Sequence, residues 1–238
     1  MATDVAVVIA YRDMGVIERA RSFAFVHDWY RQLRWHVVVE GGDNDTSFGR
    51  ASAINTAVAR SGADIIVQTD PDQVVPLSRI REAVDLARQQ PGLVLPYDRY
   101  LRLNQPFTTA VLAGAVNPFH LGVEHCEEYG PNGTGGVTVF SLATWIAVRG
   151  LDERFGLWGG DDSAFAYACD AMVAPTRRIP GDMVHLWHPT LPQAVVGSPG
   201  YLAQFSILAQ YRDAAAIGPD AVRAIVEARR CTTPRSST

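Results

Sequence analysis

The sequence contains no lysine, so all 21 of its basic side chains are arginines. Without lysine, the chain cannot form a Schiff base with a substrate carbonyl and cannot carry the lysine of a P-loop. It also has no run of basic residues, and its formal net charge is −4. Because binding to a phosphate backbone depends on clustered positive charge, this pattern disfavours a nucleic-acid partner.

Cysteine and long hydrophobic runs are scarce as well. The three cysteines, Cys126, Cys169 and Cys231, are odd in number and widely spaced, which fits neither a disulfide framework nor a zinc ribbon. The apolar run at residues 5–10 is too short for a signal peptide or a membrane span. We therefore expect a cytoplasmic protein without a transmembrane segment.

The composition is that of a folded protein. Of the 238 residues, 47% are hydrophobic and 19% are charged. A chain this apolar is not disordered, and its length allows one large domain or two small ones. No internal repeat and no interdomain linker divides it.

Apolar runs and amphipathic stretches alternate along the first half, which predicts an α/β fold. Continuous apolar runs are typical of strands buried on both faces, and a 3.6-residue period is typical of helices. We expect strands at residues 5–10, 35–40, 64–69 and 93–95, separated by helices at 16–33, 50–60 and 76–90. This order predicts a parallel sheet that binds ligands at the carboxyl ends of its strands. No GxGxxG motif follows the first strand, which argues against an ordinary dinucleotide enzyme.

The second half has a weaker pattern. We expect a helix within residues 106–119, a loop at 124–136, a strand at 137–141, helices at 142–149 and 161–172, two closing helices at 199–216 and 219–230, and a flexible tail.

Asp70 and Asp72 follow directly on the third predicted strand, with Pro71 between them. Two carboxylates at the carboxyl end of a buried strand suit a hard divalent cation and a diphosphate that the cation bridges. The alternative interpretation is a solvated turn that begins with an aspartate.

A second group of candidate residues is the segment Trp158-Gly159-Gly160-Asp161-Asp162. The glycines allow a ligand to approach the backbone closely, and the indole offers a face on which a sugar can stack. A carboxylate at the start of a helix can act as a general base, although the helix dipole there lowers its pKa. The alternative is that Asp161 only caps the helix.

His185 and His188 form a third candidate group near the end of the chain. Aspartate oxygens with one imidazole suit Mn²⁺ better than zinc, which prefers more nitrogen or sulfur. In an extended strand, residues three apart face opposite sides, so only one of these histidines reaches a metal unless the segment turns.

Five segments, taken together, resemble motifs of the beta-1,4-galactosyltransferases in order and spacing. These are FGRASAIN (48–55), similar to FNRAxLLN; DPD (70–72), at the position of DVD; GGV (135–137); GLDERF (150–155), similar to GFDERF; and WGGDD (158–162), similar to WGGED. The resemblance extends over about residues 5–190. The chain is also similar to family-2-like enzymes and to the polypeptide N-acetylgalactosaminyltransferases. The resemblance suggests a compact bacterial or phage enzyme.

The resemblance implies a GT-A glycosyltransferase of EC class 2.4. Its fold would be a Rossmann-like, mostly parallel central sheet flanked by helices, with a C-terminal helical extension. Residues 1–198 would form the GT-A domain, with a nucleotide-sugar half at 1–96 and an acceptor and catalytic half at 97–198. Residues 199–230 would be the C-terminal helices and 231–238 the tail.

The resemblance also implies roles for individual residues. Asp162 would be the catalytic base and Asp161 would bind the acceptor hydroxyl, although Asp161 stands where the family has glutamate. Asp72 would bind Mn²⁺ (or Mg²⁺), with a further ligand from His185 or His188. The residues implied in binding a UDP-sugar donor are Tyr11, Arg12, Asp13, Phe48, Arg50, Asp70, Gly135, Gly136 and Trp158.

These residues predict an inverting transfer from a UDP-sugar to a hydroxyl of a glycan, a lipid or a protein. The alternatives are a retaining transferase of the N-acetylgalactosaminyltransferase type, a sugar nucleotidyltransferase, and an inactive protein that binds a nucleotide sugar or a glycan. We expect the acceptor site to be built from residues 97–132 and from the helices after Pro199.

Overall fold

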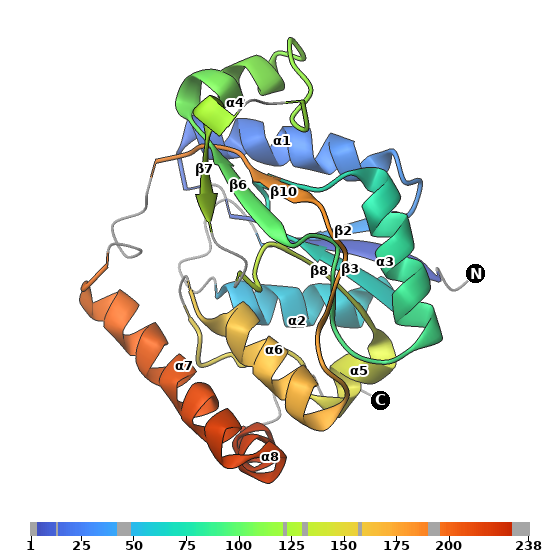
Figure 1. Cartoon of the computed structure of the whole chain (residues 1–238), viewed down its shortest axis with the longest axis vertical. Coiled ribbons are helices and arrows are strands. Elements are labelled where there is room, and N and C mark those ends of the chain that lie inside the picture. Colours follow the sequence, from blue (N-terminus) through green and yellow to red (C-terminus); the bar gives the residue numbers. More distant parts are fainter. Residues whose placement is uncertain are drawn as a thin grey trace.

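The computed structural model describes residues 4–12, 14–41, 49–120, 123–129, 133–156, 159–189 and 196–229. Within this part of the chain, a six-stranded sheet has helices on both faces, and a four-stranded sheet lies beside it (Figure 1). None of the helices described is long and apolar enough to cross a membrane.

The six-stranded sheet contains all four strands expected in the first half of the chain. Its strands run in the order β2 (His36–Glu40), β1 (Val5–Ala10), β3 (Ile65–Thr69), β8 (Val137–Ser141), β5 (Val94–Leu95) and β9 (Arg177–Arg178). β1 pairs in parallel with β2 and β3, whereas β8 lies antiparallel between β3 and β5. The sheet is therefore mostly parallel, with the antiparallel β8 inserted beside β3.

The four-stranded sheet was not expected. It contains β4 (Gln73–Val74), β10 (Asp182–His185), β6 (Arg99–Leu103) and β7 (Cys126–Tyr129), paired in that order. The prediction of a loop at residues 124–136 was wrong for the part that forms β7. The sequence CEEY has little intrinsic strand preference, so its pairing with β6 decides its conformation.

The helices agree with the sequence pattern more closely. They are α1 (Ile17–Arg31), α2 (Arg50–Ser61), α3 (Leu77–Gln89), α4 (Gln105–Leu112), α5 (Leu142–Ala147), α6 (Asp161–Met172), α7 (Pro199–Ile217) and α8 (Pro219–Ala228), with a short 3₁₀ turn at Val123–His125. α4 begins at an Asn104 cap, where the side chain accepts a hydrogen bond from the Phe107 N–H. It ends before residue 119 because Gly114 adopts a φ of +70°.

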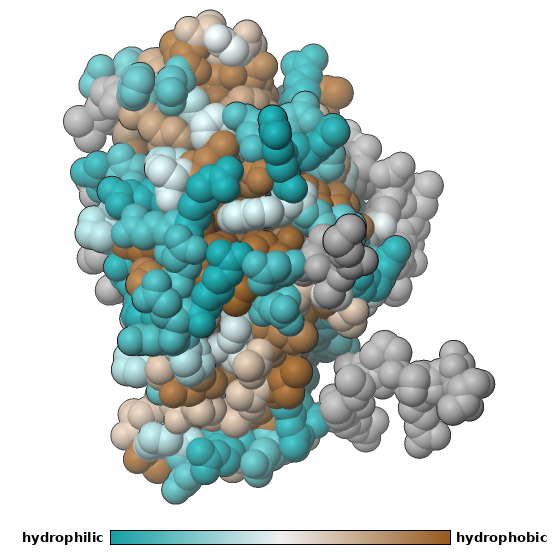
Figure 2. All heavy atoms as spheres, turned by 90° about the vertical axis from the view of Figure 1, so that its right-hand side faces the viewer, coloured by the Kyte–Doolittle hydropathy of each residue, from teal (hydrophilic) through white to brown (hydrophobic). Residues whose placement is uncertain are grey.

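The alternating side chains of β1 enter two different hydrophobic cores. Ala6 and Val8 face the core formed with α2, α6, α7 and α8. Val7 and Ile9 face the core formed with α1, α3, α4 and the four-stranded sheet. This is the two-sided burial that a continuous apolar strand predicts. Polar side chains cover much of the outer face that carries α3, as Figure 2 shows.

α7 and α8 are attached to the rest of the domain by a buried charge cluster. The Asp152 carboxylate accepts hydrogen bonds from the Tyr211 hydroxyl at 2.8 Å and from Arg154 Nη2 at 2.7 Å, and the Arg229 Nε lies 3.7 Å away. Although burial raises it, the pKa of Asp152 is held below its ordinary value by the hydrogen bonds from Arg154 and Tyr211. The cluster therefore fixes the C-terminal helices against the loop that precedes α6.

Tyr211→Phe is expected to lower the free energy of unfolding by about 1–3 kcal/mol, because the buried carboxylate of Asp152 loses one hydrogen-bond donor. Urea denaturation measures the change. Tyr201→Phe, which removes a hydroxyl from the same helix outside this cluster, is the matched control and should change stability by less than about 0.5 kcal/mol. Equal stabilities for the two variants would contradict a stabilising role of the charge cluster around Asp152.

Candidate active site

The candidate residues converge at one edge of the six-stranded sheet. Asp70 follows β3, and its backbone N–H donates to the carbonyl of Gly136, which precedes β8, at 2.9 Å. Because β3 and β8 are antiparallel neighbours, the end of one meets the start of the other. The sheet thus brings the DPD and GGV segments together, although they are more than sixty residues apart in the sequence.

Arg50, the first residue of α2, gathers three carboxylates around one guanidinium group. It contacts Asp70 at 2.6 Å and Asp162 at 3.2 Å, and it also pairs with Asp161. The Arg50 side chain is 15% exposed, so these interactions are shielded from water. Gln68 of β3 donates a further hydrogen bond of 3.1 Å to the Asp162 carboxylate.

Asp162 has a strongly perturbed carboxyl group. Burial raises its pKa to about 8; Arg50 opposes this shift, and the neighbouring Asp161 and Asp70 add to it. Burial also raises the pKa of Asp70, which Arg50 opposes. The helix N-terminus was expected to lower the pKa of the candidate base, but burial and like charge outweigh the dipole. The site therefore holds a group that exchanges a proton near neutral pH.

The two glycines before β8 give the site room. A Cβ on Gly135 would lie 2.7 Å from the Asp162 Oδ2, and one on Gly136 would overlap the Gln73 side-chain amide. Gly136 also has a φ of +99°, which favours glycine. The Tyr97 hydroxyl donates to the Gly135 carbonyl and fixes the loop.

Asp72, His185 and His188 form a cluster able to hold a metal ion. One oxygen of Asp72 lies 3.5 Å from the His185 Nε2 and the other lies 3.1 Å from the His188 Nε2. One ligand atom from each residue lies within 4.8 Å of the others. Both histidines face Asp72 because β10 ends at His185, where the Leu186 N–H donates to the Asp72 carbonyl at 2.8 Å. Both histidines therefore reach the same carboxylate, although residues three apart in an extended strand face opposite sides.

The chemistry of this cluster fits a divalent cation. Burial lowers the pKa of His185 to about 4, although Asp72 opposes that shift, so the imidazole is neutral and able to act as a ligand. Its buried Nδ1 has no hydrogen-bond partner within the part of the chain that the structure describes. Two imidazoles and a carboxylate can hold a divalent cation, and this set contains more nitrogen than the set of aspartate oxygens and one imidazole expected from the sequence.

The structure describes only some of the other residues predicted to bind the donor. Tyr11 follows β1 at the same sheet edge, where its ring stacks on Phe23 with centroids 3.9 Å apart. Arg12 follows it, and Asp13, Phe48 and Trp158 lie outside the described residues. Arg50, which the resemblance implies in binding the donor, has its guanidinium among the carboxylates of the site.

Three residues of the site were missed by the sequence analysis. Gln68 is buried inside an apolar strand, Gln73 begins β4, and Tyr97 follows β5. A polar glutamine within the run IIVQT was the available signal for Gln68. Gln73 and Tyr97 had no such signal, because their roles depend on contact with the glycine loop.

α7 packs against Gly160, which was also not expected. Gly160 adopts a φ of +93°, and a Cβ there would lie 2.9 Å from the Phe155 ring and 3.3 Å from the Leu208 Cβ. α7 therefore lies directly against the residue that precedes Asp161 and Asp162.

Residues 117–186 match the family model described as the N-terminal domain of galactosyltransferase. No curated protein matches the chain in sequence. Glucosyl-3-phosphoglycerate synthase from Mycobacterium tuberculosis, solved with Mn²⁺, UDP-glucose and phosphoglyceric acid, is similar in structure with a TM-score of 0.51 and 13% identity, over 87% of this chain and 80% of that one. Residues 1–349 of S. aureus TarS, in complex with UDP-GlcNAc, give a TM-score of 0.54 and 8% identity, over 87% and 66%.

The catalytic domain of Drosophila beta1,4-galactosyltransferase 7, in complex with xylobiose, is 18% identical with a TM-score of 0.43 over 73% of this chain. This chain spans 63% of the length of that protein. The predicted fold class is confirmed by the TM-scores above 0.5: the chain has the GT-A fold of glycosyltransferases, and its residues 117–186 match a galactosyltransferase family model.

Proposed function

We propose that this protein is a metal-dependent glycosyltransferase that transfers a sugar from a UDP-sugar to an acceptor hydroxyl with inversion. The observation that carries the proposal is the pairing of two features at one sheet edge. Asp72 with two histidines offers a cation site, and Asp162 offers a carboxyl group with a raised pKa. A cation can stabilise a departing diphosphate, and a carboxylate can take the proton of an attacking hydroxyl.

On the donor side, a metal held by Asp72 and His185 or His188 would supply Lewis-acid stabilisation of the diphosphate leaving group. The donor itself would lie across the carboxyl ends of β1 and β3 and against the glycine pair. We assign the donor contacts to Tyr11, Arg12, Asp13, Phe48, Arg50, Asp70, Gly135, Gly136 and Trp158.

On the acceptor side, the Asp162 carboxylate takes the proton of the acceptor hydroxyl. The hydroxyl oxygen forms a bond to the anomeric carbon, and the bond from that carbon to UDP breaks with its electron pair on the leaving oxygen. Asp161 has a side chain only 3% exposed and pairs with Arg50, so its contact with an acceptor requires the ion pair to open. We place this activity in the cytoplasm, with a glycan, lipid or protein as acceptor.

The decisive experiment incubates the protein with UDP-sugars and Mn²⁺, with and without a chelator, and identifies every product. A transferase releases UDP, and proton NMR of the new glycosidic bond distinguishes inversion from retention. In a parallel reaction with added pyrophosphate, a nucleotidyltransferase would convert the UDP-sugar into UTP and a sugar 1-phosphate. Binding of the donor without any product from a broad acceptor panel would favour the inactive alternative.

Gly135→Ala is expected to lower turnover by roughly tenfold or more, because the new Cβ lies 2.7 Å from the Asp162 Oδ2 and displaces the base. UDP release gives the rate. Gly133→Ala, in the same loop but with nothing near its Cβ, is the matched control and should keep its rate. Equal rates in the two variants would contradict a close approach of this loop to Asp162.

A further inference from the structure

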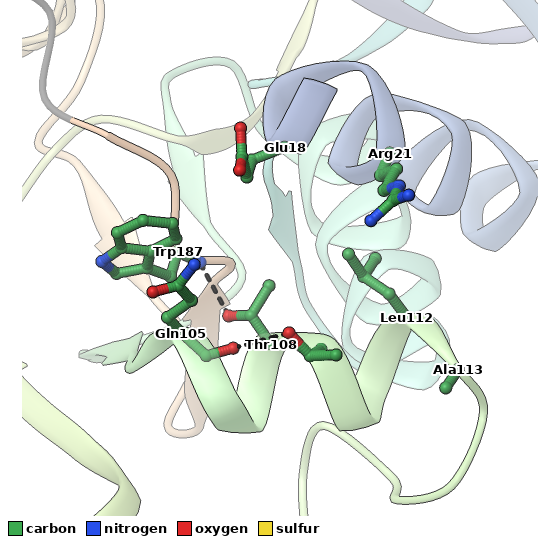
Figure 3. A pocket seen from close by; sticks show the side chains of 8 residues that line it. Glu18, Arg21, Gln105, Thr108, Leu112, Ala113 and Trp187 are labelled. Carbon is green, nitrogen blue, oxygen red and sulfur yellow. Dashed lines mark hydrogen bonds between the residues drawn. The ribbon is translucent and has the colours of Figure 1, made fainter. Parts of the chain in front are cut away.

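A hollow lies outside the carboxylate cluster, between α1, α4 and the segment after β10. Its volume is about 290 Å³, near the lower end of the range for small-molecule pockets. Figure 3 shows Trp187 and Gln105 at one end, Arg21 and Leu112 at the other, and Thr108 between them. Glu18 of α1 lies above this hollow.

The hollow has an aromatic wall. The Trp187 backbone N–H donates to the buried Thr108 hydroxyl at 2.8 Å, which ties the main chain at this residue to α4. The indole lines the hollow and remains half-exposed. It offers a flat apolar surface to one face of a pyranose ring.

The polar groups around the indole suit hydroxyl groups. Gln105 provides a side-chain amide that both donates and accepts, Glu18 accepts, and Arg21 donates. A sugar presents hydroxyls that need both kinds of partner. Glu18 and Arg21 carry opposite charges, so the hollow has no net charge to attract a phosphate or a carboxylate.

We propose that this hollow binds one neutral saccharide unit, with its ring against Trp187. Trp187 stands between His185 and His188 in the sequence, so the segment that carries both histidines also lines the hollow. Its identification as an outer unit of a glycan acceptor rests on the proposed function. α4 also lies within residues 97–132, where the acceptor site was expected.

The test is titration of the full chain, without UDP or metal, with lactose, maltose, cellobiose and chitobiose, observed by saturation-transfer NMR and calorimetry. At least one of these neutral sugars should bind saturably. Gln105→Ala should weaken that binding about tenfold, the effect expected for one lost hydrogen-bonding side chain, and Trp187→Ala should abolish it. Gln89→Ala, an exposed change on α3, is the matched control and should bind like the wild type.

The outcomes separate this proposal from the proposed function. Saccharide binding that depends on Trp187 supports the hollow even if the wild type releases no UDP. The proposal is overturned if no neutral sugar binds, if Gln105→Ala and Trp187→Ala both bind like the wild type, or if glucose 1-phosphate or glucuronate binds more tightly than every neutral sugar. The melting temperature and the Mn²⁺-dependent UDP affinity of Gln105→Ala should equal those of the wild type, which excludes a fold defect.

Discussion

Asp162→Asn is expected to reduce the rate of sugar transfer by roughly 10²–10⁴-fold, while UDP affinity in the presence of Mn²⁺ stays unchanged. Asparagine has nearly the same shape and keeps a polar contact to Arg50, but it cannot take up the proton of the acceptor hydroxyl. Transfer rates and UDP affinities for both proteins measure the effect. A variant that retains wild-type turnover would refute the base assignment and reopen the retaining mechanism.

The pH profile of the wild type provides an independent readout of the same group. A base must be deprotonated to act, so turnover should rise as the pH rises through about 8, the value to which burial raises the pKa of Asp162. The residual rate of Asp162→Asn should lack this rise. A wild-type profile already level at pH 5 would mean that an ordinary carboxylate, or no carboxylate, limits the reaction.

The same pKa makes a prediction about stability. The folded-state pKa lies above the value of about 3.9 for an unfolded aspartate, so ionisation of Asp162 destabilises the fold. This loss of stability is absent below the unfolded-state pKa of about 3.9 and grows until the pH passes the folded-state pKa of about 8. Asp162→Asn should therefore gain melting temperature relative to the wild type between about pH 4 and pH 8. If the difference in melting temperature between the two proteins stays constant from about pH 4 to pH 8, the pKa of Asp162 is ordinary.

Asp161→Asn is the matched control for Asp162→Asn, because it alters the adjacent carboxylate on the same helix. The resemblance implies that Asp161 binds the acceptor hydroxyl, so its loss should weaken acceptor binding and raise the acceptor KM more than it lowers kcat. Equal kcat losses in the two variants would show that the carboxylates act as one unit.

Asp72→Asn is expected to abolish Mn²⁺-dependent binding of UDP, with a loss of more than about 100-fold. The carboxylate is the one oxygen ligand in the cluster and faces both His185 and His188. The fold should survive, because the backbone carbonyl of Asp72 still accepts the Leu186 N–H. Calorimetry with Mn²⁺ and with a chelator measures the effect, and unchanged UDP affinity with Mn²⁺ would refute the assignment.

The two histidines should differ in a second pair of variants. His185 is buried with an unpartnered Nδ1, whereas His188 has a ring nitrogen 2.9 Å from the Pro189 carbonyl. We expect His185→Ala to lose more metal-dependent UDP affinity than His188→Ala. Equal affinities in these variants and the wild type would place the metal elsewhere.

The local pattern of the sequence was sufficient for most helices and for five strands of the six-stranded sheet, but it did not predict β9. Residues 5–10 are apolar throughout and lie between two cores, and Asp161–Met172 forms a helix with the predicted bounds. These elements follow from side chains within a few positions of one another, which periodicity reports directly. Asp70 and Asp72 lie after the carboxyl end of β3, the position where the general rule for such sheets predicts ligand-binding residues.

The order of the motifs identified Asp70, Asp72, Asp162 and the histidines as candidates, but their partners followed from the fold. Sequence reasoning could not have joined Arg50 to three carboxylates, because those contacts span up to 112 residues. Nor could it have placed the Tyr97 hydroxyl on the Gly135 carbonyl. Each contact requires the sheet to be assembled first.

The sequence by itself therefore determined the α/β class, the helices and the identity of the acidic and histidine motifs, since these depend on local chemistry. Only the tertiary structure decided that β6 and β7 pair, that His185 and His188 both face Asp72, and that Asp162 has a raised pKa. Pairing, burial and electrostatic coupling depend on which distant segments come together. The isolated letters CEEY, HLWH and WGGDD do not specify those neighbours.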